Sequence, residues 1–135
     1  MAVIRTQASS KATTLVAARK ARTSIWSSQT LTAGAADTTS STVSVAEGMR
    51  GGVHVRIENG ATGPTLAADV EVWASYDTSG TIWVLLATVE GSTANDGVVT
   101  GEVPLDDSVV AVKLVGGGNT GQNVTAKADL VATRM

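Results

Sequence analysis

Cysteine and phenylalanine are absent from this chain of 135 residues, and its aromatic side chains are three tryptophans and one tyrosine. Without cysteine the protein has no disulfide, no thiolate metal site and no thiol nucleophile. Without phenylalanine the core has to be built from Val, Leu, Ile and Ala. Valine favours strands because its branched Cβ packs well on a pleated surface, and fourteen glycines supply turns. This composition is typical of an all-β protein.

Acidic side chains are absent from the first 36 residues, which nevertheless carry five basic ones. These are Arg5, Lys11, Arg19, Lys20 and Arg22. Residues 37–135 carry all twelve acids and five bases, so the formal net charge of −2 divides into +5 before Asp37 and −7 from Asp37 onward. Such a split indicates a basic N-terminal arm attached to an acidic globular body.

The hydrophobic pattern changes near the same place in the chain. Residues 1–23 show no strand alternation, whereas alternating apolar runs follow from Ser24 onward. We therefore predict an extended basic arm over residues 1–23 and a single β-sandwich domain over residues 24–135. Chain ends rich in Ala, Ser and Thr are ordered only when something holds them, so we expect the arm to lie on the surface of a partner. Fully extended, 23 residues span about 80 Å.

Eight strand-like runs are predicted after Ser24, joined by short turns rich in Gly, Asn and Asp. They cover residues 25–31, 42–46, 53–58, 68–77, 82–90, 98–103, 109–115 and 124–131. None of the connections is long enough to hold the helix that a parallel crossover needs. The sequence therefore predicts an antiparallel β-sandwich of the jelly-roll type, in which residues 68–90 form a hairpin.

Candidate catalytic groups are few. His54 is the only histidine, and the alternation of its strand directs it outward, between the inward Val53 and Val55. A catalytic histidine needs a nucleophile or a carboxylate beside it, and no motif in the chain supplies one. We therefore expect His54 to face solvent or an interface.

Metal and phosphate sites receive no better support. Residues 95–96 and 106–107 place polar pairs in loops of the kind that bind Ca²⁺, but the spacing of a calcium loop is missing and turn chemistry explains them equally well. The glycine-rich residues 116–121 lack the Lys-Ser/Thr ending of a phosphate loop, so we predict a mobile hairpin loop there. We expect no metal, no cofactor and no catalytic residue, and we predict that the protein is not an enzyme.

The basic arm limits the choice of partners. Five positive charges can contact phosphates, but no aromatic residue is interleaved with them and the body is acidic. No apolar run approaches the length of about 20 residues that a membrane span needs. We therefore expect neither nucleic acid nor a membrane as partner, and we predict that the five bases dock on an acidic protein surface.

Residues 70–86 resemble a hairpin found in many jelly-roll modules. In those modules a strand that ends in Ser-x-Asp, here Ser75 and Asp77, is followed by a glycine turn, a tryptophan and an apolar strand. Carbohydrate-binding modules of the discoidin type use this hairpin, and so do small structural proteins of tailed bacteriophages. Trp73 and Trp83 then either form a platform for a glycan or pack in the core or in an interface.

The rest of the domain resembles the small β-sandwich structural proteins of tailed bacteriophage virions. The resemblance lies in segments rich in Thr, Gly and Asn, at residues 30–34, 55–64 and 118–122. Capsid decoration or cement proteins of this group often join a β-rich domain to an arm that grips the shell. The resemblance implies a non-enzymatic decoration protein, a homo-oligomer (dimer or trimer) bound to the major capsid protein or another virion protein. It would be made in the host cytoplasm and located on the phage head.

Two alternatives remain open at this point. The chain is a tail tube or tail-end structural protein in the first alternative, and a carbohydrate-binding jelly-roll module in the second.

Overall fold

The computed structural model describes residues 20–46 and 49–134, and all regular secondary structure within them is β-strand. The strands are β2 (Lys20–Leu31), β3 (Thr38–Thr39), β4 (Val43–Ser44), β5 (Met49–Asn59), β6 (Asp69–Ser75), β7 (Trp83–Glu90), β8 (Val98–Leu105), β9 (Ala111–Gly117) and β10 (Val124–Arg134). The predicted all-β class is confirmed. The described residues contain no helix that is long and apolar enough to cross a membrane.

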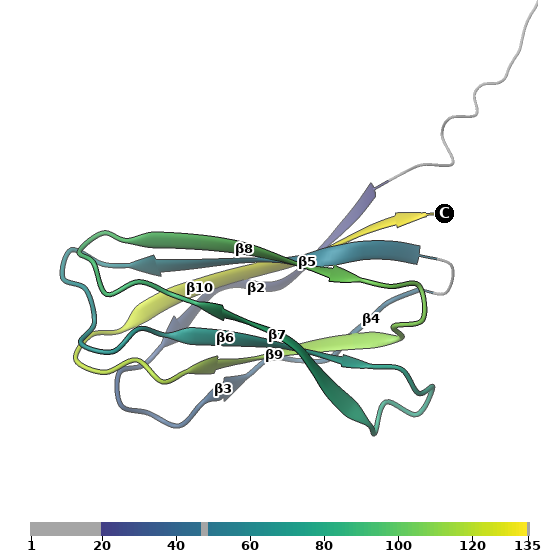
Figure 1. Cartoon of the computed structure of the whole chain (residues 1–135), viewed down its shortest axis with the longest axis horizontal. Helices are drawn as coiled ribbons and strands as arrows, with labels where there is room; N and C mark the ends of the chain where they lie inside the picture. Colours follow the sequence, from purple (N-terminus) through teal and green to yellow (C-terminus); the bar gives the residue numbers. More distant parts are fainter. Residues whose placement is uncertain (1–19, 47–48, 135) are drawn as a thin grey trace, which may run out of the picture.

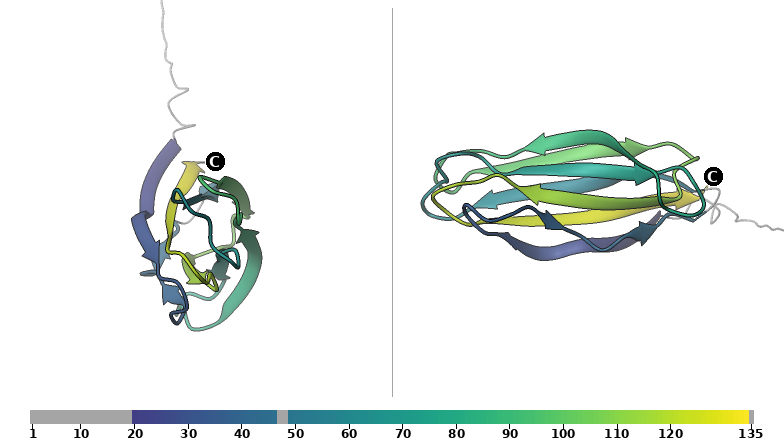
Figure 2. Two further views of the ribbon diagram at one scale, coloured as in Figure 1. Left: turned by 90° about the vertical axis from the view of Figure 1, so that its left-hand side faces the viewer. Right: turned by 90° about the horizontal axis from the view of Figure 1, so that it is seen from below.

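The strands form two antiparallel sheets that face each other as the layers of a sandwich (Figures 1 and 2). One sheet has the order β2-β10-β5-β8, and the other has the order β3-β9-β6-β7, with β4 pairing to β9 as well. If β3 and β4 are taken as one interrupted strand, the pairing is nested. The first strand pairs with the last, the second with the seventh, the third with the sixth and the fourth with the fifth. This is the connectivity of a jelly roll, which confirms the prediction.

Between β3 and β4, the side chain of Ser40 keeps the chain hydrogen-bonded to β9. The backbone N–H of Ser40 donates to the carbonyl of Leu114 at 2.8 Å, and the Oγ of Ser40 accepts from the backbone N–H of Leu114 at 2.8 Å. The serine hydroxyl thereby replaces a missing ladder bond, because a buried N–H has to find an acceptor. The side chain of Leu114 is fully buried in the core.

The core lies between the sheets and consists of Val, Leu, Ile and Ala with one large aromatic side chain, Trp26. Trp26 comes from β2 and reaches across to β9. A side chain at Gly116 would lie within 3.1 Å of the Trp26 ring and 3.2 Å of the Leu31 side chain. Glycine at position 116 therefore leaves the space that the indole fills.

The first and last strands are longer than predicted. β2 begins at Lys20, where it pairs with Thr133 near the end of β10, so residues 20–23 belong to the sandwich and not to an arm that ends at residue 23. The register between β2 and β10 shifts twice, because extra residues bulge out of β2. Residues 20–24 pair regularly, but residues 21–24 are all exposed, so this part of β2 has no alternation of apolar and polar side chains. Residues 1–19 lie outside the described residues.

Two further expectations need correction. Residues 49–52 were expected in a turn but form the start of β5, paired with the end of β10 through Gly51 and Ala132. The glycine-rich residues 116–121 do not close a hairpin, because β9 and β10 lie in different sheets. Asn119 anchors this connection: its buried side chain donates from Nδ2 to the carbonyls of Leu31 and Gln122, both at 2.9 Å.

Candidate functional site

The sandwich has two outer faces, and their chemistry differs. The outer face of β10, β5 and β8 carries paired charges, and we call it the charged face. The outer face of β9, β6 and β7 carries Trp73, Trp83, Leu85 and Lys113, and we call it the tryptophan face.

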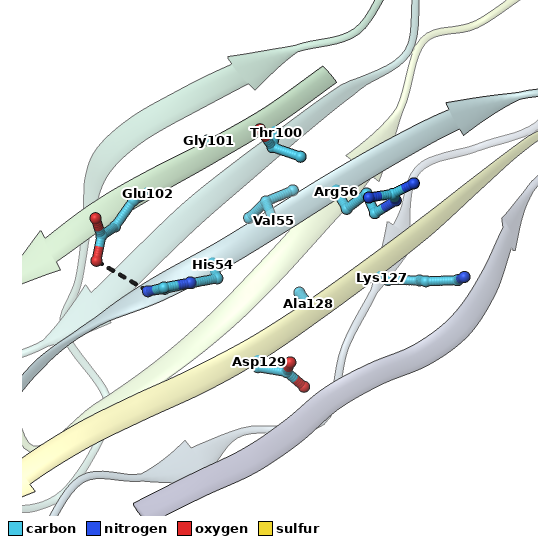
Figure 3. A pocket seen from close by; sticks show the side chains of 9 residues that line it. All are labelled: His54, Val55, Arg56, Thr100, Gly101, Glu102, Lys127, Ala128 and Asp129. Atoms are coloured by element: carbon cyan, nitrogen blue, oxygen red, sulfur yellow. Dashed lines mark hydrogen bonds and ion pairs between the residues drawn. The ribbon is translucent and has the colours of Figure 1, made fainter. Parts of the chain in front are cut away.

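The charged face holds a shallow depression of about 420 Å³ around His54 (Figure 3). β5, β8 and β10 supply its walls. The lining residues are His54, Val55, Arg56, Thr100, Gly101, Glu102, Lys127, Ala128 and Asp129. Because the floor is the outer side of a sheet, the depression is open to solvent and does not enclose a ligand as catalytic pockets do.

His54 is half-exposed and points outward, as its strand alternation predicted. Its Nε2 lies 2.9 Å from Oε2 of Glu102 on the neighbouring strand β8. Within the described part of the chain, no hydroxyl group shares a hydrogen bond with the imidazole. The contact joins a histidine and a carboxylate of neighbouring strands across the ladder.

The remaining charges of this face also neutralise one another. Arg22 Nη1 contacts Asp129 Oδ2 at 2.7 Å, and Lys127 Nζ lies 3.5 Å from Glu58 Oε1. Arg56 is hydrogen-bonded to the same Glu58, and this bond is the main reason that the pKa of Glu58 is below its usual value. The charged face is therefore electrically balanced and mostly solvated, and exposed pairs of this kind contribute little to stability.

The tryptophan face contains both tryptophans proposed as a platform. Trp73 in β6 pairs across the ladder with Leu85 of β7 and Lys113 of β9, and Trp83 is the first residue of β7. The indole Nε1 of Trp73 donates to Glu71 Oε1 at 3.1 Å, and the ammonium group of Lys113 lies 4.4 Å from the centre of the Trp83 ring. Both rings are half-buried on the outside of the sheet, so neither belongs to the core.

The turn between β6 and β7 positions this surface. Asp77 accepts hydrogen bonds from the hydroxyls of Ser75 at 2.8 Å and Ser79 at 2.6 Å, and from the backbone N–H of Thr81 at 3.1 Å. These bonds, led by the one from Ser79, hold the pKa of Asp77 far below its usual value. Gly80 supplies the left-handed conformation, with φ of 66°. The Ser-x-Asp and glycine features of the sequence are therefore the parts of one turn.

Apolar side chains are exposed where β7 begins. Ile82, just before the strand, is 65% exposed, and Val84 and Leu85 are 45% and 42% exposed. Leu85 lies on the tryptophan face beside Trp73, whereas Val84 lies on the inner side and is exposed at the edge of the sheet. Among the described strands, β7 pairs with β6 alone. Single exposed apolar residues are ordinary, but a contiguous group beside two tryptophans is typical of a surface that binds a partner.

The other end of the tryptophan face is acidic. Asp69 and Glu71 of β6, Glu90 of β7 and Asp37 lie close enough together to affect one another. Burial is the main cause that raises the pKa of Asp69, and the neighbouring carboxylates raise it further. Among the described side chains, none of these four acids forms an ion pair with a base within 4.0 Å.

The acidic loop residues considered as calcium ligands are turn residues in the structure. Asp106 Oδ1 accepts from the backbone N–H of Ser108 at 2.9 Å and from its hydroxyl at 2.5 Å. Asn95 Oδ1 accepts from the N–H of Gly63 at 2.9 Å, and Asp96 has the left-handed φ of 54°. The side chains of Asn95 and Asp106 thus shape their loops.

The predicted arm residues are only partly described. Arg5, Lys11 and Arg19 lie outside the described residues, and of Lys20 only the backbone is described, in β2. Arg22 also lies in β2, where its ion pair with Asp129 engages it within the domain. Assigning Arg22 to a free arm is therefore corrected. Glu102 and Lys113 belong to the two candidate surfaces but were not singled out by the sequence, because only the strand pairing brings them beside His54 and Trp83.

Comparison with known proteins gives structural likeness without sequence kinship. No family model matches the chain, and no curated protein matches it. The VP2 subviral particle of infectious bursal disease virus is similar with a TM-score of 0.53 and 13% identity, over 86% of this chain and 32% of that chain. A T13 particle of the same virus is similar with a TM-score of 0.53 and 11% identity, over 87% of this chain and 31% of that chain.

An adhesin domain is also similar. The K1 domain of Lys-gingipain from Porphyromonas gingivalis W83 gives a TM-score of 0.47 and 12% identity, over 86% of this chain and 98% of that chain.

The chain spans about a third of the VP2 chain. At these identities the likeness shows the fold alone: the chain has the same kind of β-sandwich as a protein of virus particles.

Proposed function

We propose that this protein is a non-enzymatic structural protein of a virion, a decoration or cement protein on the head of a tailed bacteriophage. It docks on the major capsid protein or another virion protein after synthesis in the host cytoplasm. The observation that carries the proposal is the group of exposed apolar side chains at the start of β7, Ile82, Val84 and Leu85, next to Trp73 and Trp83. Such a surface suits a stable protein contact, whereas the shallow charged depression around His54 offers no enclosed site for chemistry.

The basic segment before β2 is the proposed grip on the shell. Residues 1–19 carry Arg5, Lys11 and Arg19 and no acid. β2 is an edge strand, and it begins at one end of the sandwich, beside the end of β10 (Figure 1). From that point 19 residues extend to about 65 Å when stretched. Several such segments in one oligomer bind with an avidity that a single segment lacks.

The test is binding to heads of the encoding phage that were assembled without this protein. A chain lacking residues 1–19 keeps the whole of β2, so it should fold as the full chain does. We expect the deletion to abolish co-sedimentation with the heads. A full-length variant with Arg5, Lys11 and Arg19 changed to Gln should bind more weakly than the wild type, and the wild type should itself weaken with added salt. Undiminished binding by the deleted chain would refute the grip.

Carbohydrate binding is the second candidate, and it is favoured by the two outward tryptophans. Glycans stack on exposed aromatic rings, but Lys113 already lies over Trp83 and Glu71 holds the edge of Trp73. A glycan array probed with the wild type, Trp73→Ala and Trp83→Ala decides between the functions. A hit that both variants lose supports carbohydrate binding, and an array without hits removes it.

A tail tube or tail-end role is the third candidate. The edge of β7, which has no partner among the described strands, is the feature that favours it, because an edge that pairs head to tail builds rings or tubes. Negative-stain images of the isolated protein should show small particles under the decoration hypothesis. Rings or tubes in those images would support the tail hypothesis instead.

A further inference from the structure

β7 is an edge strand without most of the features that keep edge strands from pairing. Lysine, proline and inward charges usually block such edges. β8, an edge of the other sheet, has Pro104 and Glu102, whereas β7 has one charge, Glu90, at its last position. Ile82 and Val84 are exposed beside this open edge. The one protective feature of β7 is a bulge at Leu86.

We propose that β7 pairs with β7 of a second copy, antiparallel and across a twofold axis. The two β3-β9-β6-β7 sheets then form one continuous sheet. A twofold contact is closed, because the same patch serves on both sides, and it gives a dimer without further growth. The proposal does not depend on which shell the protein binds.

The bulge at Leu86 allows β7 to pair with itself so that opposite residues point to the same face of the joined sheet. Register with β6 places Trp83, Leu85, Thr88 and Glu90 on the outer side of β7, and Val84 and Val89 on the inner side. A twofold axis between Leu86 and Ala87 sets Val84 opposite the partner's Val89. It also sets Trp83 opposite the partner's Glu90. In a regular strand these pairs would point to opposite faces, but the extra residue brings each pair to the same face.

Charge complementarity favours a second copy as the occupant of this edge. Lys113 lies over Trp83 at one end of the tryptophan face, and the acidic group around Asp69 and Glu90 lies at the other end. The twofold axis reverses the direction of the second face, so Lys113 of each copy meets the partner's Glu90. Each dimer has two such contacts, and they partly neutralise acids that have no basic partner within the described domain.

Burial of the exposed apolar side chains adds to the contact. Val84 comes to lie beside the partner's Val89 on the inner side of the joined sheet, and Leu85 beside the partner's Thr88 on the outer side. Apolar residues at the centre with charges at the rim is the arrangement of stable interfaces. The free backbone groups of β7 gain partners at the same time.

Sedimentation velocity of the full chain over a range of concentrations is the first test. We expect a dimer for the wild type and a dimer dissociation constant at least about tenfold higher for Val84→Lys, because a buried lysine blocks an edge contact. Val98→Lys is the matched control: Val98 is 48% exposed, close to the 45% of Val84, and lies in the edge strand β8 of the other sheet. This control should dimerise as the wild type does.

Charge exchange is the second test, and it does not depend on the folding of Val84→Lys. Lys113→Glu and Glu90→Lys should each weaken the dimer, and the double variant should restore it, because the two charges meet between copies. The proposal would be overturned if the wild type were monomeric, or if Val84→Lys and Val98→Lys weakened the dimer equally. It would also be overturned if the double variant dimerised no better than the single variants. The measurement needs no capsid, so its failure is separate from a failure of head binding.

Discussion

At the scale of single residues, the composition explains how the core is filled. With no phenylalanine, the space between the sheets is closed by many small branched side chains, and each large aliphatic residue contributes much of the local packing. Leu114 is fully buried in the middle of β9 and its backbone is bonded to Ser40. Such positions leave a cavity when they are shortened, because a close-packed interior relaxes only partly.

Leu114→Ala should therefore lower the free energy of unfolding by about 2–5 kcal/mol. Leu66 is 58% exposed, so Leu66→Ala should change the free energy by no more than about 0.5 kcal/mol. Urea unfolding of both variants measures the difference. Similar effects of the two substitutions would show that Leu114 is not in the core described above.

Asp69 predicts a pH dependence whose sign follows from its raised pKa. The charged carboxylate is disfavoured in the folded state, mainly by burial and then by Glu90 and Glu71. Its cost to stability is present above the folded-state pKa and disappears as pH falls through that pKa. Asp69→Asn should be more stable than the wild type at pH 7, and the difference should vanish at acidic pH.

Glu58→Gln is the control, because it should change the stability in the opposite direction to Asp69→Asn. The pKa of Glu58 is lowered, first by its hydrogen bond with Arg56, so its contribution is present at neutral pH and is lost as pH falls through the folded-state pKa. The variant should be slightly less stable than the wild type at pH 7, by about 0.5 kcal/mol or less because the pair is partly exposed. Thermal melts of the wild type and both variants across pH 2–8 measure these two stability differences. If both substitutions changed the stability at pH 7 in the same direction, the account would be contradicted.

At the scale of elements, the β6–β7 hairpin depends on one carboxylate. Asp77→Ala removes the acceptor for Ser75, Ser79 and Thr81, so the turn should loosen and the melting temperature should fall. Amide hydrogen exchange of Thr81 should become faster, because its N–H loses its acceptor. Asp107→Ala is the control, because Asp107 is exposed and its ion pair with Arg50 is long, with 4.0 Å between Asp107 Oδ2 and Arg50 Nη2. Unchanged exchange at Thr81 in Asp77→Ala would show that the turn is held by other contacts.

Strand positions could be predicted where one face is buried and the ladder is regular. β5 from Val53, β6 and the hairpin to β7 show the period-2 pattern that the structure confirms. The pattern is lost where both sides of a strand are exposed or where glycines carry no side chain. The start of β2 is exposed over residues 21–24, and the start of β5 has Gly51 and Gly52, so neither could be located from alternation.

The candidate surfaces could be predicted less well than the strands. The sequence singled out Trp73 and Trp83 but left open whether they are buried. Lys113 lies 30 residues from Trp83 in the chain, and Glu102 lies 48 residues from His54. Such neighbours arise from strand pairing alone. Asn119, which anchors the β9–β10 connection, looked like an ordinary loop residue because its partners come from Leu31 and Gln122.

At the scale of the whole molecule, the structure refines the charge division of the sequence. Residues 20–23 are part of the sandwich, and Arg22 is paired with Asp129, so the basic segment outside the domain is residues 1–19. The domain itself is not evenly acidic. The charged face is balanced, while the tryptophan face has an acidic end and an apolar end. The basic segment, the apolar edge and the jelly-roll framework are therefore three separable parts of the proposed cement function.

One measurement tests that function most directly: a cryo-electron microscopy reconstruction of phage heads with and without this protein. The account predicts jelly-roll density on the outer surface of the head at regular lattice positions, paired through β7, with density for residues 1–19 continuing along the shell. Heads lacking the protein should show the same shell without that density. Heads with no such density, or jelly-roll density found only in the tail, would contradict the account.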